Sequence, residues 1–379
     1  MQLHVCGEQI MIQKKLGDIA TYINGYAFKP EDRGSKGLPI IRIQDLTGNA
    51  YDLGFYDGEY PERIEINNGD ILISWSASLG VYVWNRGKAL LNQHIFKVVF
   101  DKSEVNRKYF VFAVQYKLKE MELKTHGATM KHIIKKDFDN TLIPFPSYAE
   151  QERISNILLC ASNMVTMRYQ ELQKLDNLIK ARFVEMFGDS DDNWREVKIA
   201  DICSDMRTGP FGSALHHDEF VDNGIFVLGI DNAVENKFSY NRMRYITEEK
   251  YEKLKRYTVQ PGDVIITIMG TVGRSAVIPP DIPKAINTKH LACLTPNIEV
   301  VDSYFLTNAF QVHPAIRRQL EKQSKGAIMD GLNLTVIKNL TFRLPPLDLQ
   351  KQFVDIYNQV DKSKLLYPDR CAIYQPNTS

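Results

Sequence analysis

The feature that most constrains this chain is an internal repeat, in which blocks from one half return in the same order in the other. The spacing between matched residues grows from 183 at Asp18 and Asp201 to 199 at Gly127 and Gly326. The matched blocks are 15–19 (KLGDI) with 198–202 (KIADI), 68–74 (NGDILIS) with 261–267 (PGDVIIT), Gly80 with Gly273, Leu91-Asn92 with Ile286-Asn287, His94 with His290, 127–130 (GATM) with 326–329 (GAIM), and Pro146 and Gln151 with Pro345 and Gln350. Self-similarity at a long period indicates a repeated structural unit. We therefore predict two similar domains, with small loop insertions between the matched blocks.

Local patterns predict that each repeat is a mixed, strand-rich domain. A Gly-Asp turn signal precedes a short apolar strand at residues 71–74 in the first copy and at 264–267 in the second. Further predicted elements are strands at 38–43 and 225–230 and helices at 107–118 and 304–319. The copies differ most between the matched blocks, as expected of a constant frame that carries variable binding loops. The predicted fold class is α+β.

A long helix is predicted between the repeats. Residues 149–187 contain neither proline nor glycine, and apolar residues recur there at alternating spacings of three and four. The predicted interface positions are Ile154, Leu158, Ala161, Val165, Leu172, Leu175, Ile179 and Met186, with Arg168 and Arg182 interrupting the seam. This pattern is typical of the a and d positions of a coiled coil, and the helix would be about 55–60 Å long. Such a seam needs a partner helix.

The second repeat is followed by the same proline-to-helix segment, which predicts a shorter distal helix. Pro368 limits its length, because proline cannot continue a helix. We expect two tandem domains of pseudo-twofold symmetry, separated by the two helices in an antiparallel coiled coil. The expected divisions are residues 1–147 (first domain), 148–190 (central spacer helix), 195–346 (second domain), 347–366 (shortened distal helix) and 367–379 (disordered tail). The first half of the central seam is then left for another chain to cover.

Composition excludes several classes of protein. The five cysteines form no C-x-x-C pair, so neither a zinc site nor a disulfide framework is predicted. There is no run of about 18 apolar residues and no signal-peptide core, so we expect no membrane segment and a cytoplasmic protein. Each repeat holds 19 Lys and Arg against 17 Asp and Glu, counted over 1–147 and 195–346. A nucleic-acid function therefore cannot be argued from net charge.

No motif for catalysis or metal binding emerges. The two Pro-Pro pairs, Pro279-Pro280 and Pro345-Pro346, lack the polar residue and the aromatic that an adenine methyltransferase places around them. There is no phosphate-binding glycine loop. Adjacent histidines at 216–217 point to opposite sides of a strand and have no further ligand at metal spacing. We expect no catalytic residue, no metal and no cofactor in this chain.

Four motifs carry a resemblance to a known family. They are residues 15–19 with 24–29 (NGYAFK), the Gly-Asp strand followed by a Ser/Thr-rich loop, 144–146 (PFP) leading to 150–154 (EQERI), and the helix end at 183–189 (FVEMFGD). On these motifs the chain resembles the specificity (S) subunits of Type I restriction-modification systems. The resemblance extends from Lys14 to about Asp361. It departs from the family pattern in its distal helix, which is about half the usual length.

The resemblance implies that each domain is a target-recognition domain that reads one half of a bipartite site in double-stranded DNA. The helices would set the distance between the halves. Two methyltransferase (modification) subunits, which carry S-adenosylmethionine and adenine-N6 chemistry, would dock on the helices. Motor and nuclease (restriction) subunits would then join. Self-association through the uncovered spacer helix is a further possibility.

The repeat loops supply polar and aromatic side chains suited to base edges and phosphates. The candidate DNA-binding residues are Tyr26, Lys29, Ser76, Ser78, Gln93, His94, Thr129, Lys131, Arg207, Phe211, Thr271, Arg274, Lys289 and His290. Two alternatives stay open at this point. One is an enzyme, a reader fused to methyltransferase or nuclease activity, and the other is a coiled-coil scaffold that does not contact DNA.

Overall fold

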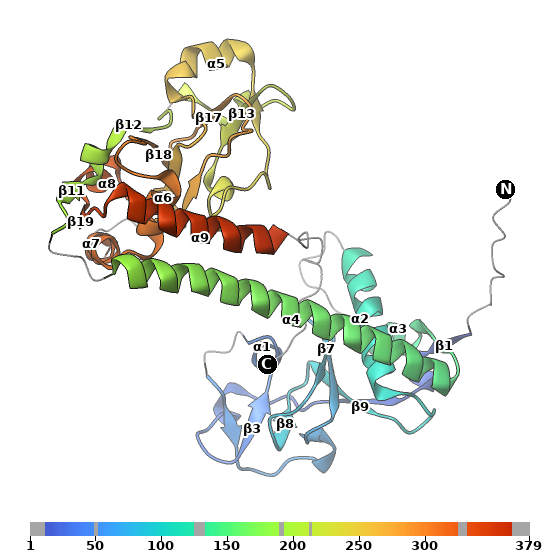
Figure 1. Ribbon diagram of the computed structural model, residues 1–379. Helices are drawn as coiled ribbons and strands as arrows, with labels where there is room; N and C mark the ends of the chain where they lie inside the picture. Colours follow the sequence, from blue (N-terminus) through green and yellow to red (C-terminus); the bar gives the residue numbers. More distant parts are fainter. Residues whose placement is uncertain are drawn as a thin grey trace. The chain divides into compact units, whose positions relative to one another are not determined.

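A computed structural model describes residues 12–48, 52–124, 133–188, 193–211, 214–324 and 332–365. The chain divides into two compact units, the first ending at Tyr169 and the second spanning Gln170–Asp369 (Figure 1). The boundary falls inside one long helix, α4 (Tyr148–Phe187). Each unit is described by itself below. Thr129, Lys131 and the tail 367–379 lie outside the described residues.

Within its described residues, unit 1 contains two four-stranded sheets and a small two-stranded one. One four-stranded sheet is antiparallel, with the order β2 (Thr21–Asn24), β9 (Ile95–Val99), β6 (Ile71–Ser74) and β7 (Gly80–Val83). The other has the order β4 (Phe55–Tyr56), β3 (Leu38–Ile41), β8 (Ala89–Leu91) and β5 (Glu65–Ile66), with β3 and β8 parallel. β1 (Gln13–Lys15) pairs with β10 (Leu142–Pro144). The helices are α1 (Ile43–Leu46), α2 (Arg107–Lys124), α3 (Lys135–Asp139) and the start of α4.

Unit 2 repeats this topology. Its four-stranded sheet has the order β12 (Cys203–Thr208), β18 (Leu291–Pro296), β15 (Val264–Thr267) and β16 (Ser275–Val277). Its second sheet is β14 (Tyr245–Ile246), β13 (Ile225–Leu228) and β17 (Ala285–Asn287), and β11 (Glu196–Lys198) pairs with β19 (Thr341–Arg343). Its helices are α5 (Glu248–Leu254), α6 (Ser303–Val312), α7 (Pro314–Ser324), α8 (Leu334–Asn339) and α9 (Leu347–Leu365). The predicted strands at 71–74 and 264–267 and the α+β class are confirmed.

In each unit, the Gly-Asp strand has apolar neighbours on both of its faces. Ile73 and Ile266 point toward the core shared with the helices, whereas Leu72 and Ile265 point toward the core shared with the other sheet. Alternate side chains of a strand point to opposite faces, and burying each large aliphatic side chain contributes roughly 1.5–3 kcal/mol. This strand therefore joins the two cores of its unit, which explains why its sequence stands out in both repeats.

The prediction of a single helix over residues 304–319 is wrong. The segment 304–319 forms two helices, because α6 ends at Val312 and α7 begins at Pro314. His313 between them has an extended backbone. Proline has no N–H to donate and disfavours helical geometry in the residue before it. The signal for the break was therefore present in the sequence.

Hydrogen bonds between strands correct the repeat alignment at Leu91-Asn92. The backbone N–H of Asn92 donates to Ile41 O (3.0 Å), and that of Thr288 donates to Leu228 O (3.1 Å). Asn92 is therefore equivalent to Thr288 and not to Asn287. With this one-residue correction, Gln93 and His94 correspond directly to Lys289 and His290.

The same comparison corrects the match of Gly80 with Gly273. Gly80 pairs with Ser74 across the β6–β7 hairpin. In unit 2, Thr267 donates its N–H to Arg274 O (2.8 Å), so Arg274 occupies the place of Gly80. The hairpin loop of unit 2 is one residue longer, and Gly273 lies inside it with a φ of 81°. An insertion of this kind places a cation where unit 1 has a glycine.

Within unit 2, α9 runs antiparallel to the last part of α4. The ring of Phe353, near the start of α9, lies 5.1 Å from that of Phe183, near the end of α4. Lys364, at the other end of α9, pairs with Asp176, two turns earlier in α4. Both helices join the core of unit 2 through aromatic side chains. None of the described helices has the length and apolar character needed to cross a membrane.

Candidate nucleic-acid interface

The end of β2 and the loops that follow β6 and β8 meet in unit 1. The indole Nε1 of Trp75 donates to Asn24 Oδ1 (3.2 Å), and the Trp75 ring lies edge-on to His94 at 5.3 Å. The side chains of Gln93 and His94 approach each other at 3.1 Å. The structure thus brings the predicted residues Gln93 and His94 together and adds Trp75 and Asn24, which sequence reasoning missed.

An aromatic row lies beside these loops. Tyr26 is 43% exposed, and its ring is 5.0 Å from that of Phe28, which is in turn 5.2 Å from Tyr56. Gly25 makes this placement possible, because a Cβ there would lie 2.1 Å from Asn92 O. Phe28 and Tyr56 were not among the predicted residues. The exposed side chain of Lys29 follows the row along the chain.

The two predicted serines of the β6–β7 loop differ in accessibility. Ser78 is exposed, whereas Ser76 is 6% exposed. The carbonyl of Ser78 accepts a hydrogen bond from the hydroxyl of Ser74 (2.5 Å), which holds the loop in place. Only Ser78 therefore presents its side chain to the outside.

Unit 2 gathers cations where unit 1 has aromatic and amide groups. Arg244 lies against Gly229, where a Cβ would be 2.5 Å from its Nη1, directly after the strand β13 that pairs with β17, the strand leading to Lys289. Burial, followed by the positive charges of Lys289 and Arg244, lowers the pKa of His290. Arg244 also pairs with Asp231 (2.6 Å). Lys289 is exposed. Arg244 was missed, although an arginine pair at 242 and 244 in a variable loop was a usable signal.

Two further loops of unit 2 flank this cluster. Gly209 lies against the 287–288 turn, since a Cβ there would be 2.2 Å from Asn287 O, and so brings the segment of Phe211 to the turn that carries Lys289. Phe211 is 54% exposed. In the β15–β16 loop, Thr271 and Arg274 are exposed, and the hydroxyl of Thr267 accepts the N–H of Arg274 (2.9 Å).

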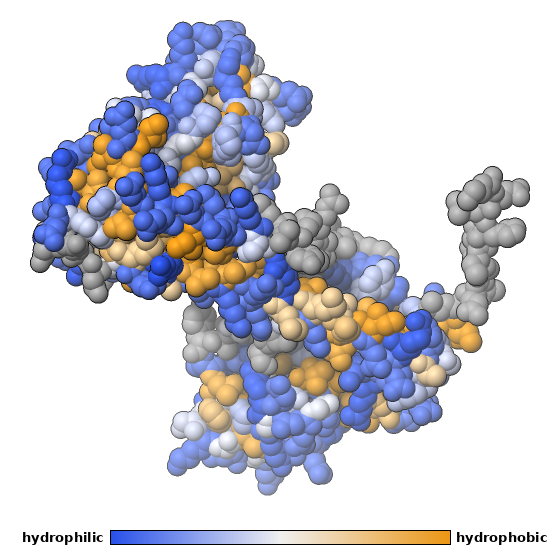
Figure 2. Space-filling view, viewed as in Figure 1, coloured by the Kyte–Doolittle hydropathy of each residue, from blue (hydrophilic) through white to orange (hydrophobic). Residues whose placement is uncertain are grey.

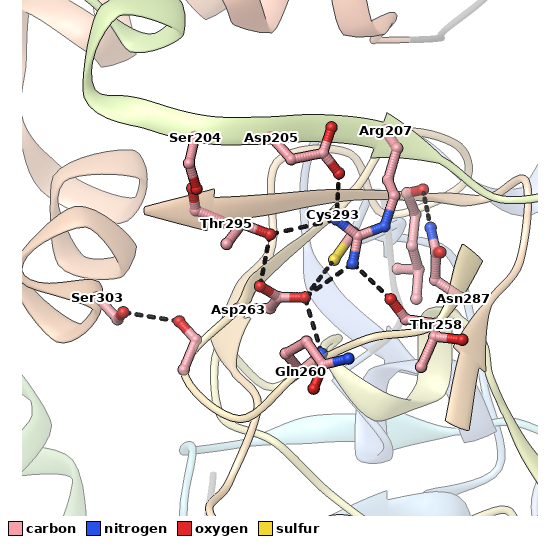
Figure 3. A network of polar contacts seen from close by, with 12 residues as sticks. Ser204, Asp205, Arg207, Thr258, Gln260, Asp263, Asn287, Cys293, Thr295 and Ser303 are labelled. Atoms are coloured by element: carbon pink, nitrogen blue, oxygen red, sulfur yellow. Dashed lines mark hydrogen bonds and ion pairs between the residues drawn. The ribbon is translucent and has the colours of Figure 1, made fainter. Parts of the chain in front are cut away.

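Arg207, one of the DNA-contact candidates, has its guanidinium engaged by other residues of unit 2. Its Nη2 donates to Asp263 Oδ2 (2.9 Å) and to Thr258 O (2.6 Å), as Figure 3 shows. Thr295 and Cys293 complete the surroundings of Asp263, whose side chain is 1% exposed. The guanidinium of Arg207 is thus occupied within the core of unit 2, where it compensates a buried carboxylate.

The predicted interface positions of α4 fall into two groups. Ile179 is buried in the core of unit 2, and Leu172, Leu175 and Met186 are half-buried. In the part of α4 that belongs to unit 1, Ile154 and Val165 are half-buried, Ala161 is exposed and Leu158 is 39% exposed. Beside these positions lie the exposed side chains of Ile157, Met164, Met167 and Tyr169. Figure 2 shows apolar residues along the visible face of this helix.

Among the described residues, no group of three or more His, Cys, Asp or Glu side chains could hold a metal ion. Two shallow pockets of about 270 and 350 Å³ lie in unit 2, away from the loops described above. The candidate residues of both units lie on the loops described above and do not line these two pockets.

Comparison with known proteins identifies the family. The family model for the Type I restriction modification DNA specificity domain matches twice, over residues 11–177 and 191–366. The chain belongs to this family. The resemblance expected from the sequence is thereby confirmed, and the double match corresponds to the internal repeat.

Individual specificity subunits are similar to this chain along most of its length. It is 25% identical over 369 residues to the Type I restriction enzyme EcoBI specificity subunit of Escherichia coli, covering 89% of this chain and 77% of that protein. It is 22% identical over 319 residues to the MjaVIII specificity subunit of Methanocaldococcus jannaschii, covering 79% of this chain and 74% of that protein.

Solved structures share the fold. The S subunit of a Type I system from M. genitalium matches with a TM-score of 0.55 at 15% identity, covering 97% of this chain and 94% of that one. A structure described as showing complex assembly of the type I R-M system matches with a TM-score of 0.56 at 16% identity, covering 94% and 92%. The chain is thus a DNA-specificity subunit, a non-catalytic component of a restriction-modification system. This replaces both alternatives, the free-standing enzyme and the scaffold.

Proposed function

We propose that each unit of this specificity subunit reads one half of a bipartite site in double-stranded DNA, and that the chain directs adenine-N6 methylation and restriction by partner subunits. The observation that carries the proposal is the equivalence of Gln93-His94 and Lys289-His290. The same turn of the same frame carries different side chains in the two units. A glutamine amide suits adenine, whereas lysine suits guanine or a phosphate. Two unlike readers on one frame imply an asymmetric site.

The loop chemistry of the two units suggests different modes of contact. Unit 1 offers Tyr26, Phe28 and Trp75 next to an amide, which suits apolar contact with thymine methyl groups and hydrogen bonds to base edges. Unit 2 offers Lys289, Arg244 and Arg274, which suit phosphates and guanine. We therefore expect binding through unit 2 to depend more steeply on salt than binding through unit 1.

The family and the exposed surface of the spacer helix suggest which proteins bind this chain. We propose that two modification subunits, which carry S-adenosylmethionine, dock on the spacer helices and that restriction subunits join them in the cytoplasm. The exposed apolar side chains of Leu158, Met164 and Met167 support a protein interface on the first part of α4. A second copy of this chain on the same surface is the alternative occupant.

The main test is methylome sequencing of cells that express this chain with its modification subunit. We expect a single bipartite adenine motif that disappears when the chain is left out. Methylation that persists without the chain would contradict the proposal. So would a single uninterrupted motif in place of two half-sites separated by unread base pairs. The purified chain alone should transfer no methyl group to duplex DNA.

The interface is tested with the double variant Leu158→Asp and Val165→Asp. Two carboxylates in the apolar stretch should prevent association with the modification subunit, as measured by size-exclusion chromatography with light scattering. The matched control is Gln170→Asp with Gln173→Asp on exposed positions of the same helix. If the chain alone changes its mass while its complex does not, self-association is the correct reading. Unchanged behaviour in both experiments would refute the interface.

A further inference from the structure

A buried glutamine occupies the fourth position of α4. Gln151 is 1% exposed. Its Oε1 accepts the backbone N–H of Asn106 (2.9 Å), and its Nε2 donates to Pro146 O (2.9 Å). Pro146 lies just before the helix, and Asn106 lies at the start of α2. One amide side chain therefore connects the helix, the segment leading into it and the recognition unit.

The second repeat has the same arrangement. Gln350 is the fourth residue of α9 and is fully buried. Its Oε1 accepts the N–H of Asp302 (3.0 Å), and its Nε2 donates to Pro345 O (2.9 Å) and to Val300 O (3.2 Å). The geometry is thus a property of the repeat and is not confined to one site.

The partner of each glutamine caps a helix that packs on a sheet. The side chain of Asn106 accepts the N–H of Tyr109 (3.1 Å) at the start of α2, and that of Asp302 accepts the N–H of Tyr304 (2.7 Å) at the start of α6. The N–H groups of the capping residues have no partner within their helices. Because each glutamine accepts that N–H, it joins the spacer helix to a helix of the recognition unit.

The two units differ in what else holds the spacer helix. In unit 2, Phe183 and Phe187 of α4 and Phe353 of α9 are fully buried in the hydrophobic core. In unit 1, no described side chain of α4 belongs to the hydrophobic core cluster. The buried side chains of this part of α4, among the described residues, are Gln151 and Ser155. Among the described residues, the hydrogen bonds of Gln151 thus form a buried polar attachment of α4 to unit 1, beside half-buried apolar side chains such as Ile154 and Val165.

We propose that Gln151 is a positioning residue, which fixes the direction of the central spacer helix relative to the first recognition unit, and that Gln350 is its counterpart reinforced by aromatic packing. The consequence for DNA rests on the proposed function: a fixed direction would fix the distance between the two half-sites. Gln151 is too deeply buried to touch DNA or a partner protein itself. It acts through the backbone of Asn106 and Pro146.

The proposal is tested by distance measurement in the full-length chain. One spin label is attached to the exposed Cys160 of α4 and a second to Glu62→Cys on the surface of unit 1. Cys6, Cys203 and Cys371 are replaced by serine, and Cys293 is fully buried and left in place. Pulsed electron paramagnetic resonance then gives the distribution of the distance between helix and unit.

The decisive variant is Gln151→Met, which keeps the length of the side chain and removes its hydrogen bonds. The control is Gln173→Met, the same change at an exposed position of α4. We expect the distribution to become about twofold broader in Gln151→Met and to stay unchanged in the control. Equal widths in the two variants would overturn the proposal.

Two further variants separate positioning from loss of folding. Gln151→Asn keeps an uncharged amide but is one methylene shorter, so it cannot reach both Asn106 and Pro146; it serves if Gln151→Met does not fold, and the distribution should again broaden. Gln350→Met, with labels at Asn358→Cys and Asp222→Cys and with Cys160 replaced by serine, should broaden less, because the phenylalanines remain. A larger effect at Gln350 than at Gln151 would contradict the assigned difference.

A second readout links position to recognition. In cells with the modification subunit, Gln151→Met should allow methylation of sites whose half-sites are one base pair closer or further apart, whereas a merely destabilised chain should methylate fewer sites of unchanged spacing. If the distribution broadens but no bipartite motif exists, the proposed function fails and the positioning role stands. If the motif exists and its spacing stays strict while the distribution stays narrow, the positioning role fails alone.

Discussion

The two units balance the charge of an equivalent aspartate with different cations. Asp70 and Asp263 occupy equivalent turns, in which they accept the N–H of Asn67 (2.8 Å) and of Gln260 (2.9 Å) respectively. In unit 1 the cation is Lys97 of β9, at 3.2 Å from Asp70. In unit 2 it is Arg207 of β12. A repeated fold has thus kept the charge balance of this turn while changing the strand that supplies it.

Strand register shows which positions the two cations occupy. Lys97 lies opposite Leu72, and Cys293 lies opposite Ile265, so Cys293 occupies the place of Lys97. Arg207 lies opposite Cys293, in the place that Ile23 has opposite Lys97. The difference shows that the requirement belongs to the turn and not to one residue. The two aspartates also differ in burial, since the side chain of Asp70 is 26% exposed and that of Asp263 is 1% exposed.

The largest expected effect is that of exchanging a whole recognition unit. Replacing residues 1–147 with the same block of another specificity subunit should change one half of the methylated motif completely and leave the other half intact, because each unit has its own cores and loops. Methylome sequencing measures the outcome. The reciprocal exchange of 195–346 is the control and should change the opposite half. A change in both halves, or in neither, would break the comparison.

The ion pairs give the next effect. Arg207→Met leaves the buried carboxylate of Asp263 without a cation and should destabilise unit 2 by about 3–5 kcal/mol. Lys97→Met should cost unit 1 only about 1 kcal/mol, because Asp70 retains contact with water. Urea unfolding followed by hydrogen exchange in each unit measures both free energies of unfolding. Arg207→Met with Asp263→Asn should recover much of the loss, and equal costs for the two single variants would contradict this account.

Acidification should also affect unit 2 selectively. Burial, with a contribution from Arg318, lowers the pKa of His313 to about 4 from its ordinary value of 6.5. Because the folded state disfavours the charged ring, the His313 side chain takes up a proton on unfolding between about pH 6.5 and pH 4. The free energy of unfolding therefore has its full value above about pH 6.5 and falls as the pH drops toward 4. The loss should be on the order of 2–3 kcal/mol at about pH 4.

The measurement uses Trp194 fluorescence in a chain with Trp75 and Trp84 replaced by phenylalanine. Trp194 lies 6.2 Å from Phe187 and reports on unit 2. His313→Asn is the control, in which this part of the pH dependence should be absent. If the unfolding free energy of the His313→Asn variant falls with decreasing pH as steeply as that of the chain with His313, the assignment to His313 is wrong.

The smallest expected effects are those of single loop contacts. Lys289→Ala or Arg274→Ala should weaken binding by about 1–3 kcal/mol if the side chain contacts a base edge, and only at the second half-site. A phosphate contact would weaken binding to all sequences alike and reduce its salt dependence. Gln93→Ala is the equivalent change in unit 1 and should affect the first half-site. Fluorescence anisotropy with paired half-site mutants distinguishes these cases.

Much of the fold could be predicted from the sequence because its signals are local. The Gly-Asp turns and the apolar strands behind them predicted β6 and β15, and the absence of proline and glycine together with apolar spacing predicted α4. The break between α6 and α7 was missed although Pro314 marked it. The candidate surfaces were predicted in part, since Gln93 with His94 and Lys289 with His290 lie on loops as expected, whereas Asn24, Trp75 and Arg244 were not found. These residues come from separate strands and loops that only the folded chain brings together.

The sequence by itself determined that this protein consists of two copies of one strand-rich frame joined by a long helix, because periodicity and turn chemistry are properties of neighbouring residues. The tertiary structure decided which polar residues act inside that frame. Arg207 and Asp263 are 56 residues apart, and only strand pairing shows that the arginine is occupied by the carboxylate. Gln151 and Gln350 matched in sequence, yet their role depends on backbone groups 45 and 48 residues away. A buried polar group is stabilised by whichever partner the fold brings to it, and that distance in space is not written in the local sequence.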